Sequence, residues 1–134
     1  MVEINGEKYL DGGVSDSIPL RRLVEQGNEK NVVVLTQPRD YEKGANKLVS
    51  LFKHKYRDYP NLISSMANRH IMYNETLNFI REQEKQGKAF VIAPPEKLIV
   101  DKIEKDRAKL EAVYNIGREE ALKRIEELKE FIKT

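Results

Sequence analysis

Apolar and polar positions alternate over the first dozen residues around an Asn-Gly pair at positions 5–6, a pattern that predicts a small β-hairpin. Residues 31–37, NVVVLTQ, then form a continuous β-branched run without alternation. Such a run predicts a strand covered on both faces, as in a parallel α/β sheet. A second short run, KAFVIAPPE at residues 88–96, predicts another buried strand that ends at the two prolines.

A short helix is expected near Ile18–Gln26. Pro19 has no N–H to lose in the first turn of a helix, and Ser17 or Asp16 can cap the free N–H groups beside it. Gly27 can end the helix in a left-handed conformation.

Three longer segments repeat apolar positions at helical spacing. The first starts at residue 45, is broken near its end by Pro60, and carries Leu48, Val49, Phe52 and Tyr56. The second runs from about residue 62 to 86, is stopped by Gly87, and carries Met66, His70, Tyr73, Leu77 and Ile80. The third is a surface helix over residues 118–133, carrying Ala121, Leu122, Ile125, Leu128 and Ile132. Everything beyond the second strand is expected to be helical.

The order of strands and helices indicates an α/β layer architecture with a thin sheet of three or four strands. Central strands need covered faces and paired edges, which so few partners barely supply. We therefore expect the chain to be part of something larger, although its 134 residues have the size of one domain.

The composition argues against several classes of protein. Hydrophobic content is 40%, and no apolar run approaches the roughly 20 residues that span a bilayer. We expect no signal peptide. The 24 basic residues nearly balance 22 acidic ones, so no nucleic-acid partner is expected. Because the chain has no cysteine, it has no disulfide and no thiolate metal site. A cytoplasmic location is the expectation.

The two histidines are expected to have structural roles. His54 and His70 lie in separate predicted helices without a paired ligand at i+4, so no metal or other cofactor is expected. His70 falls on an apolar stripe and is predicted to be packed and hydrogen-bonded. Residues 47–60, KLVSLFKHKYRDYP, could contact nucleic acid or a lipid interface, but their apolar spacing favours a core-facing helix with a basic outer face.

Four segments in order carry a family resemblance: Asp11-Gly12-Gly13, the Ser-Ile-Pro start of the first helix, VVVLTQP followed by Tyr41, and NRHIMYNETL. Together they resemble the C-terminal portion of bacterial patatin-like phospholipases over nearly the whole chain, residues 1–134. The resemblance implies part of a three-layer α/β/α fold with a mostly parallel sheet and a helical C-terminal tail. It also implies a Ser-Asp dyad, with the serine in a G-x-S-x-G elbow and the aspartate in a D-G-G or D-G-A turn.

Asp11, Gly12 and Gly13 match the aspartate motif of that family, whereas its serine motif is absent. The nearest approach, Gly13 to Ser17, fails at the final glycine. The resemblance therefore implies a lipid or ester substrate for a longer polypeptide, whose upstream part supplies the serine. This chain alone is expected to be inactive. A peripheral location at the membrane and a homo-oligomeric state are both left open.

In this interpretation Asp11 is the general base, and the two glycines fix its direction by admitting positive φ and close approach. Alanine at Gly12 should then misplace Asp11. The alternative is a non-catalytic α/β interaction module, in which Asp11 only bonds nearby N–H groups in a turn and the helical tail binds a partner.

Overall fold

The computed structural model describes residues 1–47, 49–101 and 103–133. The chain is mixed α/β and forms two compact units. Unit 1 holds Met1–Gln26 with Glu42–Arg81, and unit 2 holds Gly27–Tyr41 with the residues from Glu82 onward. None of the described helices is both long enough and apolar enough to cross a membrane.

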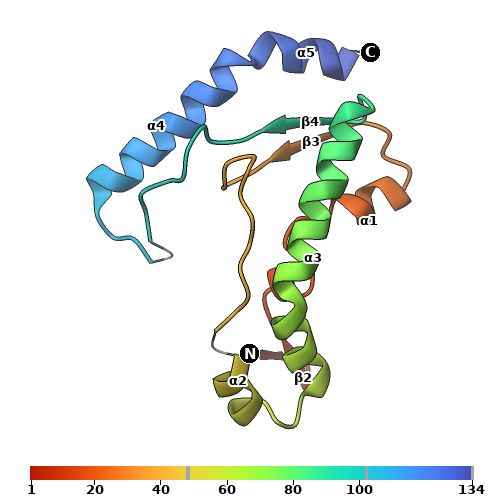
Figure 1. The fold of residues 1–134 in the computed structure, drawn as a ribbon, viewed down its shortest axis with the longest axis vertical. Coiled ribbons are helices and arrows are strands. Elements are labelled where there is room, and N and C mark those ends of the chain that lie inside the picture. Colours follow the sequence, from red (N-terminus) through yellow and green to blue (C-terminus); the bar gives the residue numbers. More distant parts are fainter. Residues whose placement is uncertain (48, 102, 134) are drawn as a thin grey trace. The chain divides into compact units, whose positions relative to one another are not determined.

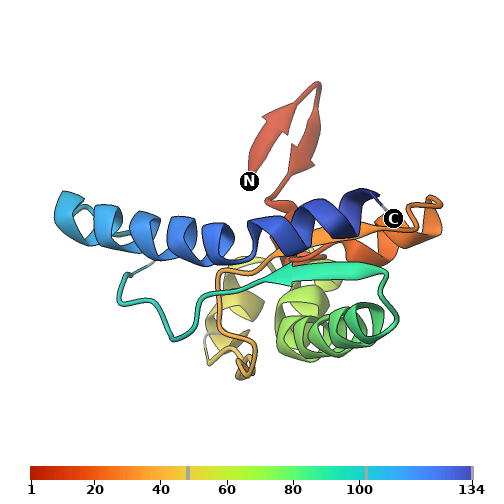
Figure 2. The same ribbon diagram turned by 90° about the horizontal axis from the view of Figure 1, so that it is seen from above.

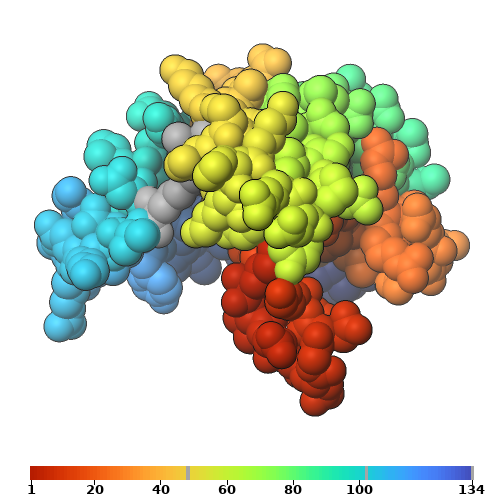
Figure 3. Space-filling model, turned by 90° about the horizontal axis from the view of Figure 1, so that it is seen from below, coloured from red at the N-terminus to blue at the C-terminus, as the bar shows by residue number. Residues whose placement is uncertain are grey.

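Unit 1 begins with the predicted hairpin. Strands β1 (Val2–Ile4) and β2 (Glu7–Tyr9) are antiparallel, with Val2 opposite Tyr9. Asn5 and Gly6 between them have φ of 53° and 80°, and two successive left-handed residues are what a tight Asn-Gly hairpin turn requires. All residues of both strands are exposed, and the hairpin stands out from the rest of unit 1 in Figures 2 and 3.

The predicted first helix is confirmed as α1 (Leu20–Glu25), although its capping differs from the expectation. Pro19 occupies the N-cap position, and no side chain caps the helix. Asp16 instead accepts a hydrogen bond from the Ile18 N–H at 3.2 Å, and Ser17 donates to an upstream carbonyl. Gly27 has the expected left-handed conformation, with φ of 87°.

The next two helices of the chain are α2 (Val49–Lys55) and α3 (Pro60–Lys85). α2 starts later than predicted, and Leu48 lies outside the described residues. Pro60 begins α3 rather than ending the preceding helix, because a proline fits the first turn of a helix. The predicted stripe of α3 is confirmed in part: Leu77 and Ile80 are buried, whereas its other members are half-buried.

Unit 2 is built on a parallel pair of strands, β3 (Asn31–Val34) and β4 (Ala89–Ile92), shown side by side in Figure 1. β4 is buried along its whole length, as predicted. β3 alternates instead, with Val33 buried but Val32 and Val34 exposed at 45% and 69%. The expectation that β3 is covered on both faces is therefore wrong for this chain.

The hairpin strands and the parallel strands form two separate two-stranded sheets. The predicted single sheet of three or four strands is thus wrong, because β1 and β2 pair only with each other in the described residues.

The two outer edges of the parallel sheet differ. The Val91 carbonyl, on the β4 edge, accepts hydrogen bonds from Arg39 Nη2 at 2.8 Å and Arg124 Nη1 at 2.6 Å. Arg39 also forms a bidentate ion pair with Glu84, in which Nη1 lies 2.6 Å from Oε2 and Nη2 lies 2.9 Å from Oε1. No described residue pairs with the outer edge of β3. One edge is therefore closed at its centre by guanidinium groups, and the other is open.

The C-terminal part contains two helices, α4 (Arg107–Lys123) and α5 (Ile125–Lys133) (Figure 1). The prediction of one helix over residues 118–133 is wrong, because the helix is interrupted. The expectation that the chain is helical directly after β4 is also wrong, because α4 starts only at Arg107. The break falls at Arg124, whose guanidinium bonds to the Val91 carbonyl and Glu127 and lies 4.2 Å from the centre of the Phe90 ring. Phe131 of α5 contacts the same ring at 5.7 Å.

Candidate functional site

Asp11 follows β2 and caps a short 3₁₀ helix, η1 (Gly12–Val14). Its Oδ1 accepts a hydrogen bond from the Gly13 N–H at 2.7 Å, and its carbonyl accepts one from the Val14 N–H at 3.0 Å. This is an Asx turn, in which a side-chain oxygen takes the place of a backbone acceptor. The turn fixes the direction of the carboxylate relative to the backbone.

The carboxylate of Asp11 is exposed, and its second oxygen, Oδ2, makes no hydrogen bond or ion pair with any other residue that the structure describes. One oxygen is thus held in place while the other stays open. A general base needs both properties, a fixed position and an oxygen that can take a proton.

The two glycines after Asp11 have different roles, and neither has a positive φ. A Cβ on Gly12 would meet nothing within 4 Å, so no steric clash supports the expectation that alanine there misplaces Asp11. A Cβ on Gly13 would lie 3.1 Å from Asp11 Oδ1, closer than side chains ordinarily pack. Gly13 is therefore the residue that allows the carboxylate to approach the backbone.

Arg69 of α3 holds the turn from the other side. Its Nε donates to the Gly13 carbonyl at 2.7 Å, and its Nη2 donates to Ser17 Oγ at 3.2 Å. Ser17 Oγ donates in turn to the same Gly13 carbonyl at 2.9 Å. Sequence reasoning missed Arg69, although a signal existed: it lies three residues after Met66 and four before Tyr73, so a charged residue shares the apolar stripe.

The serines nearest to Asp11 do not form a catalytic pair with it. Ser15 Oγ donates to the Gly12 carbonyl at 3.1 Å, and Ser17 Oγ is engaged with Gly13. The Gly13-Val14-Ser15 segment overlaps η1 instead of forming a strand-turn-helix elbow. Within the described residues, no serine hydroxyl is hydrogen-bonded to the Asp11 carboxylate.

The two histidines lie in different helices, and His70 directly follows Arg69 in α3. His70 Nδ1 is 3.0 Å from the Ala67 carbonyl, so the predicted hydrogen bond is confirmed, although the side chain is half-buried. His54 is exposed on α2. Among the described residues, no group of three or more His, Cys, Asp or Glu could hold a metal ion.

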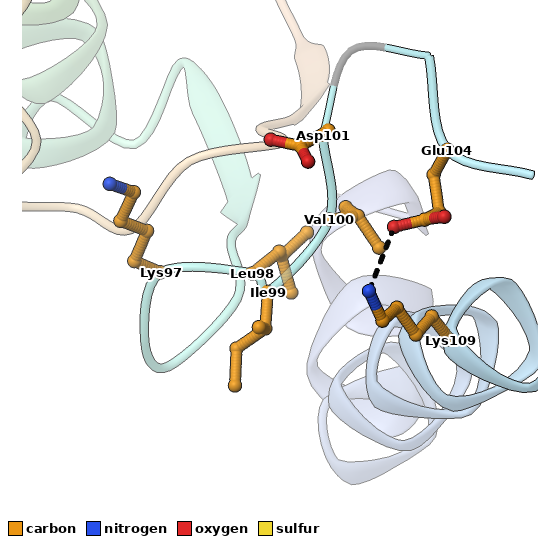
Figure 4. A pocket seen from close by; sticks show the side chains of 7 residues that line it. All are labelled: Lys97, Leu98, Ile99, Val100, Asp101, Glu104 and Lys109. Carbon is orange, nitrogen blue, oxygen red and sulfur yellow. Dashed lines mark hydrogen bonds and ion pairs between the residues drawn. The ribbon is translucent and has the colours of Figure 1, made fainter. Parts of the chain in front are cut away.

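Unit 2 contains an open groove of about 360 Å³ (Figure 4). It is formed by the loop from Lys97 to Asp101, together with Glu104 and Lys109. None of these lining residues carries a hydroxyl or imidazole group. The groove therefore offers charge and aliphatic surface but no serine-type nucleophile.

One of the two acids in this groove, Glu104, lies at the start of α4. Glu104 Oε1 accepts hydrogen bonds from the backbone N–H groups of Asp106 and Lys105, both at 2.9 Å, and Oε2 lies 3.4 Å from Lys109 Nζ. These donors lower the pKa of Glu104 because they favour its charged form, and the Asp106 N–H has the largest effect. Asp106 caps α4 through the Ala108 N–H at 2.9 Å.

Residues 59–133 match the family model described as "Domain of unknown function (DUF6363)". The chain belongs to DUF6363. The DUF6363 region includes Arg69 and the groove, whereas Asp11 lies before it. The chain is also similar to the "Uncharacterized protein YjjU" of Escherichia coli, with 28% identity over 119 residues.

The alignment with YjjU covers 87% of this chain and 33% of YjjU. The chain thus spans about a third of the length of the curated relative that it matches. No solved structure matches the chain significantly.

Proposed function

We propose that this DUF6363 chain is the base-bearing part of a patatin-like acyl hydrolase that cleaves ester bonds of lipids. Asp11 is the general base of a Ser-Asp dyad, and its serine belongs to a part of the polypeptide outside these 134 residues. The observation that carries the proposal is the Asp11 turn, which holds one carboxylate oxygen against Gly13 and leaves the other open.

The hydrogen bonds that Arg69 and Ser17 donate to the Gly13 carbonyl, which we call the clamp, support the proposal. A carboxylate is a weak base toward a serine hydroxyl, so its position must be fixed in advance of the reaction. The Gly13 carbonyl accepts hydrogen bonds from both Arg69 and Ser17, which ties the turn to α3. A turn that only connected β2 to α1 would not need this degree of restraint.

The sheet of unit 2 supports a larger fold. β3 and β4 are parallel, β3 has an open edge, and Val32 and Val34 are exposed. Parallel sheets are normally covered on both faces and extended beyond two strands. A neighbouring strand and a covering layer from the rest of the polypeptide would complete a three-layer α/β/α arrangement of the patatin type.

Labelling with a fluorophosphonate probe tests the dyad. The probe reacts with activated serines, so the intact gene product should be labelled, and Asp11→Asn should abolish the labelling because amide nitrogen and oxygen cannot accept the serine proton at neutral pH. Asp16→Asn is the matched control, since Asp16 is an exposed carboxylate in the same loop that bonds only to the Ile18 N–H.

The second candidate is a non-catalytic interaction module, favoured by the fact that the Asx turn already gives Asp11 a structural role. In that case the intact, folded product remains unlabelled, or it is labelled equally with and without the Asp11→Asn substitution. Either result would reject the dyad and leave Asp11 as a turn residue.

A further inference from the structure

Positive charge is concentrated in one stretch of unit 1. Residues 43–57 contain five basic residues and neither Asp nor Glu, although the chain as a whole has a formal net charge of only +2. The rest of the chain therefore carries a net negative charge. This stretch includes all of α2.

The exposed basic side chains of α2 and of the turn after it, together with Leu51, form what we call the α2 surface: Leu51, Lys53, His54, Lys55 and Arg57. One exposed acid, Asp58, lies in the same turn, with its Oδ1 3.8 Å from Arg57 Nε. Leu51 is 62% exposed, and the side chain of Arg57 is 81% exposed. Segment 49–57 is yellow in Figure 3, where it lies at the surface of unit 1.

The other side of α2 is partly buried. Val49, Phe52 and Tyr56 are half-buried, and the rings of Phe52 and Tyr56 stack with their centres 6.3 Å apart. α2 thus already has an apolar inner side. Leu51 is an additional large aliphatic side chain that is exposed, and Lys53 and Lys55 follow it within four residues.

We propose that the α2 surface is a docking site for a membrane that contains anionic lipids. The lysines and Arg57 contact the headgroup phosphates, and Leu51 inserts at the boundary with the acyl chains. A basic polar surface combined with an exposed aliphatic residue is the combination by which short amphipathic helices bind such interfaces.

Nucleic acid is the competing partner for a basic surface, and the structure favours lipid over it. Binding of single strands depends on aromatic rings that stack with bases. Here Phe52 and Tyr56 stack with each other and are half-buried, and the hydroxyl of Tyr59 accepts a hydrogen bond from Lys8 at 2.8 Å. The exposed apolar group is an aliphatic one, Leu51, which suits acyl chains and not bases.

The inference goes beyond the proposed function and does not depend on it, because a vesicle is bound without any chemistry at Asp11. The α2 surface and the Asp11 turn belong to the same unit. A hydrolase acting on lipids must reach an aggregated substrate, and the α2 surface would provide that contact. The binding test is therefore made with Asp11→Asn as well as with the natural residue, which separates docking from hydrolysis.

The test is co-sedimentation of the purified intact protein with vesicles of phosphatidylcholine, with or without phosphatidylserine. Binding should require phosphatidylserine and weaken at high salt. Lys53→Gln combined with Lys55→Gln should lower the partition coefficient roughly 25-fold, at about fivefold for each basic residue removed. Leu51→Ala should lower it about fivefold through the lost apolar contact.

The matched control is Lys129→Gln combined with Lys133→Gln on α5. It removes the same formal charge from exposed lysines of the other unit, and the partition coefficient should change less than about twofold, because these lysines lie outside the α2 surface. Circular dichroism of all variants reports folding, which exposed substitutions should leave intact.

Three results would overturn the proposal: no binding of the folded protein to anionic vesicles, an equal loss in the α5 control, or an unchanged coefficient in Leu51→Ala. If the α2 variants lose binding to an oligonucleotide while vesicles are not bound, the surface serves nucleic acid instead.

Discussion

At the scale of single residues, the Asp11 turn depends on partners that its motif does not contain. The D-G-G sequence accounts for the Asx turn and for the small residue at position 13. The carbonyl of that turn is held by Arg69, 56 residues away in the chain. A motif match alone would therefore leave the positioning of the carboxylate unexplained.

Replacing Arg69 by Gln should remove both contacts to the turn. We expect the free energy of unfolding to fall by about 1–3 kcal/mol, the range for hydrogen bonds made by charged groups at partly buried sites. Lysine should not rescue, because it lacks the planar fork that reaches the Gly13 carbonyl and Ser17 together. Urea unfolding measures this effect, with Arg81→Gln as the control because Arg81 is exposed and bonds to Asn78 on its own helix.

Alanine substitutions should separate the two glycines. Gly13→Ala forces the Asp11 carboxylate to move by a few tenths of an ångström, whereas Gly12→Ala meets open space. If Asp11 is the base, Gly13→Ala should lower the rate of fluorophosphonate labelling about tenfold or more, since small misplacements of a catalytic group are costly. Gly12→Ala should label at nearly the natural rate, and equal rates for the two variants would argue against a positioned base.

At the scale of elements, local capping marks where α4 begins, and a tertiary contact marks the break between α4 and α5. α4 starts beside Glu104, whose carboxylate receives two backbone N–H groups, and it ends at Arg124, which bonds to the Val91 carbonyl. The Glu104 contacts are local, whereas the contact of Arg124 joins residues that are 33 positions apart in the sequence. This explains why apolar spacing alone placed one continuous helix across the break.

Glu104 should make the start of α4 sensitive to acid. Its pKa is lowered in the folded protein, so its stabilising contribution is complete above the ordinary Glu pKa of about 4.3 and is lost as pH falls through the folded value. Glu104→Gln should therefore reduce stability at neutral pH and have little effect in strong acid, below the folded pKa, measured by urea unfolding under both conditions. Glu111→Gln, an exposed acid on α4, should show no such difference.

Arg124→Ala should loosen α5 from the parallel sheet. The substitution removes the contact to the Val91 carbonyl, the ion pair with Glu127 and the stacking on Phe90. Hydrogen exchange of α5 amides should become at least about tenfold faster, because local opening costs less free energy. Lys129→Ala, which removes only an exposed ion pair with Glu126, should leave α5 exchange unchanged.

Much of the local structure follows from the sequence. Asn5-Gly6 located the hairpin, and apolar runs located β3, β4 and α3, because these signals act over a few neighbouring residues. Arg69, the break at Arg124 and the exposure of Val34 depend on contacts between distant segments, or on the lack of them. For the site, Asp11 and Gly13 could be proposed from the motif, whereas the clamp could not.

At the scale of the whole molecule, the open edge of β3 should govern association. Val34 is 69% exposed beside that edge, so Val34→Lys places a charge where another strand would pair. We expect this variant to reduce self-association of the 134-residue chain in sedimentation velocity runs. Thr36→Lys, exposed just beyond the strand, is the control. If Val34→Lys leaves the sedimentation profile unchanged, the β3 edge is not the contact.

The closed edge of β4 has a consequence for how such association could grow. A sheet with two open edges can add copies at both sides and extend into a fibre. Here the β4 edge carries two guanidinium groups on the Val91 carbonyl, which would hinder a partner strand, whereas no described residue pairs with the β3 edge. Two copies joined through β3 would use up both open edges, and pairing in this sheet would stop at a dimer. In such an assembly Arg39 and Arg124 would limit further strand pairing as well as support the fold.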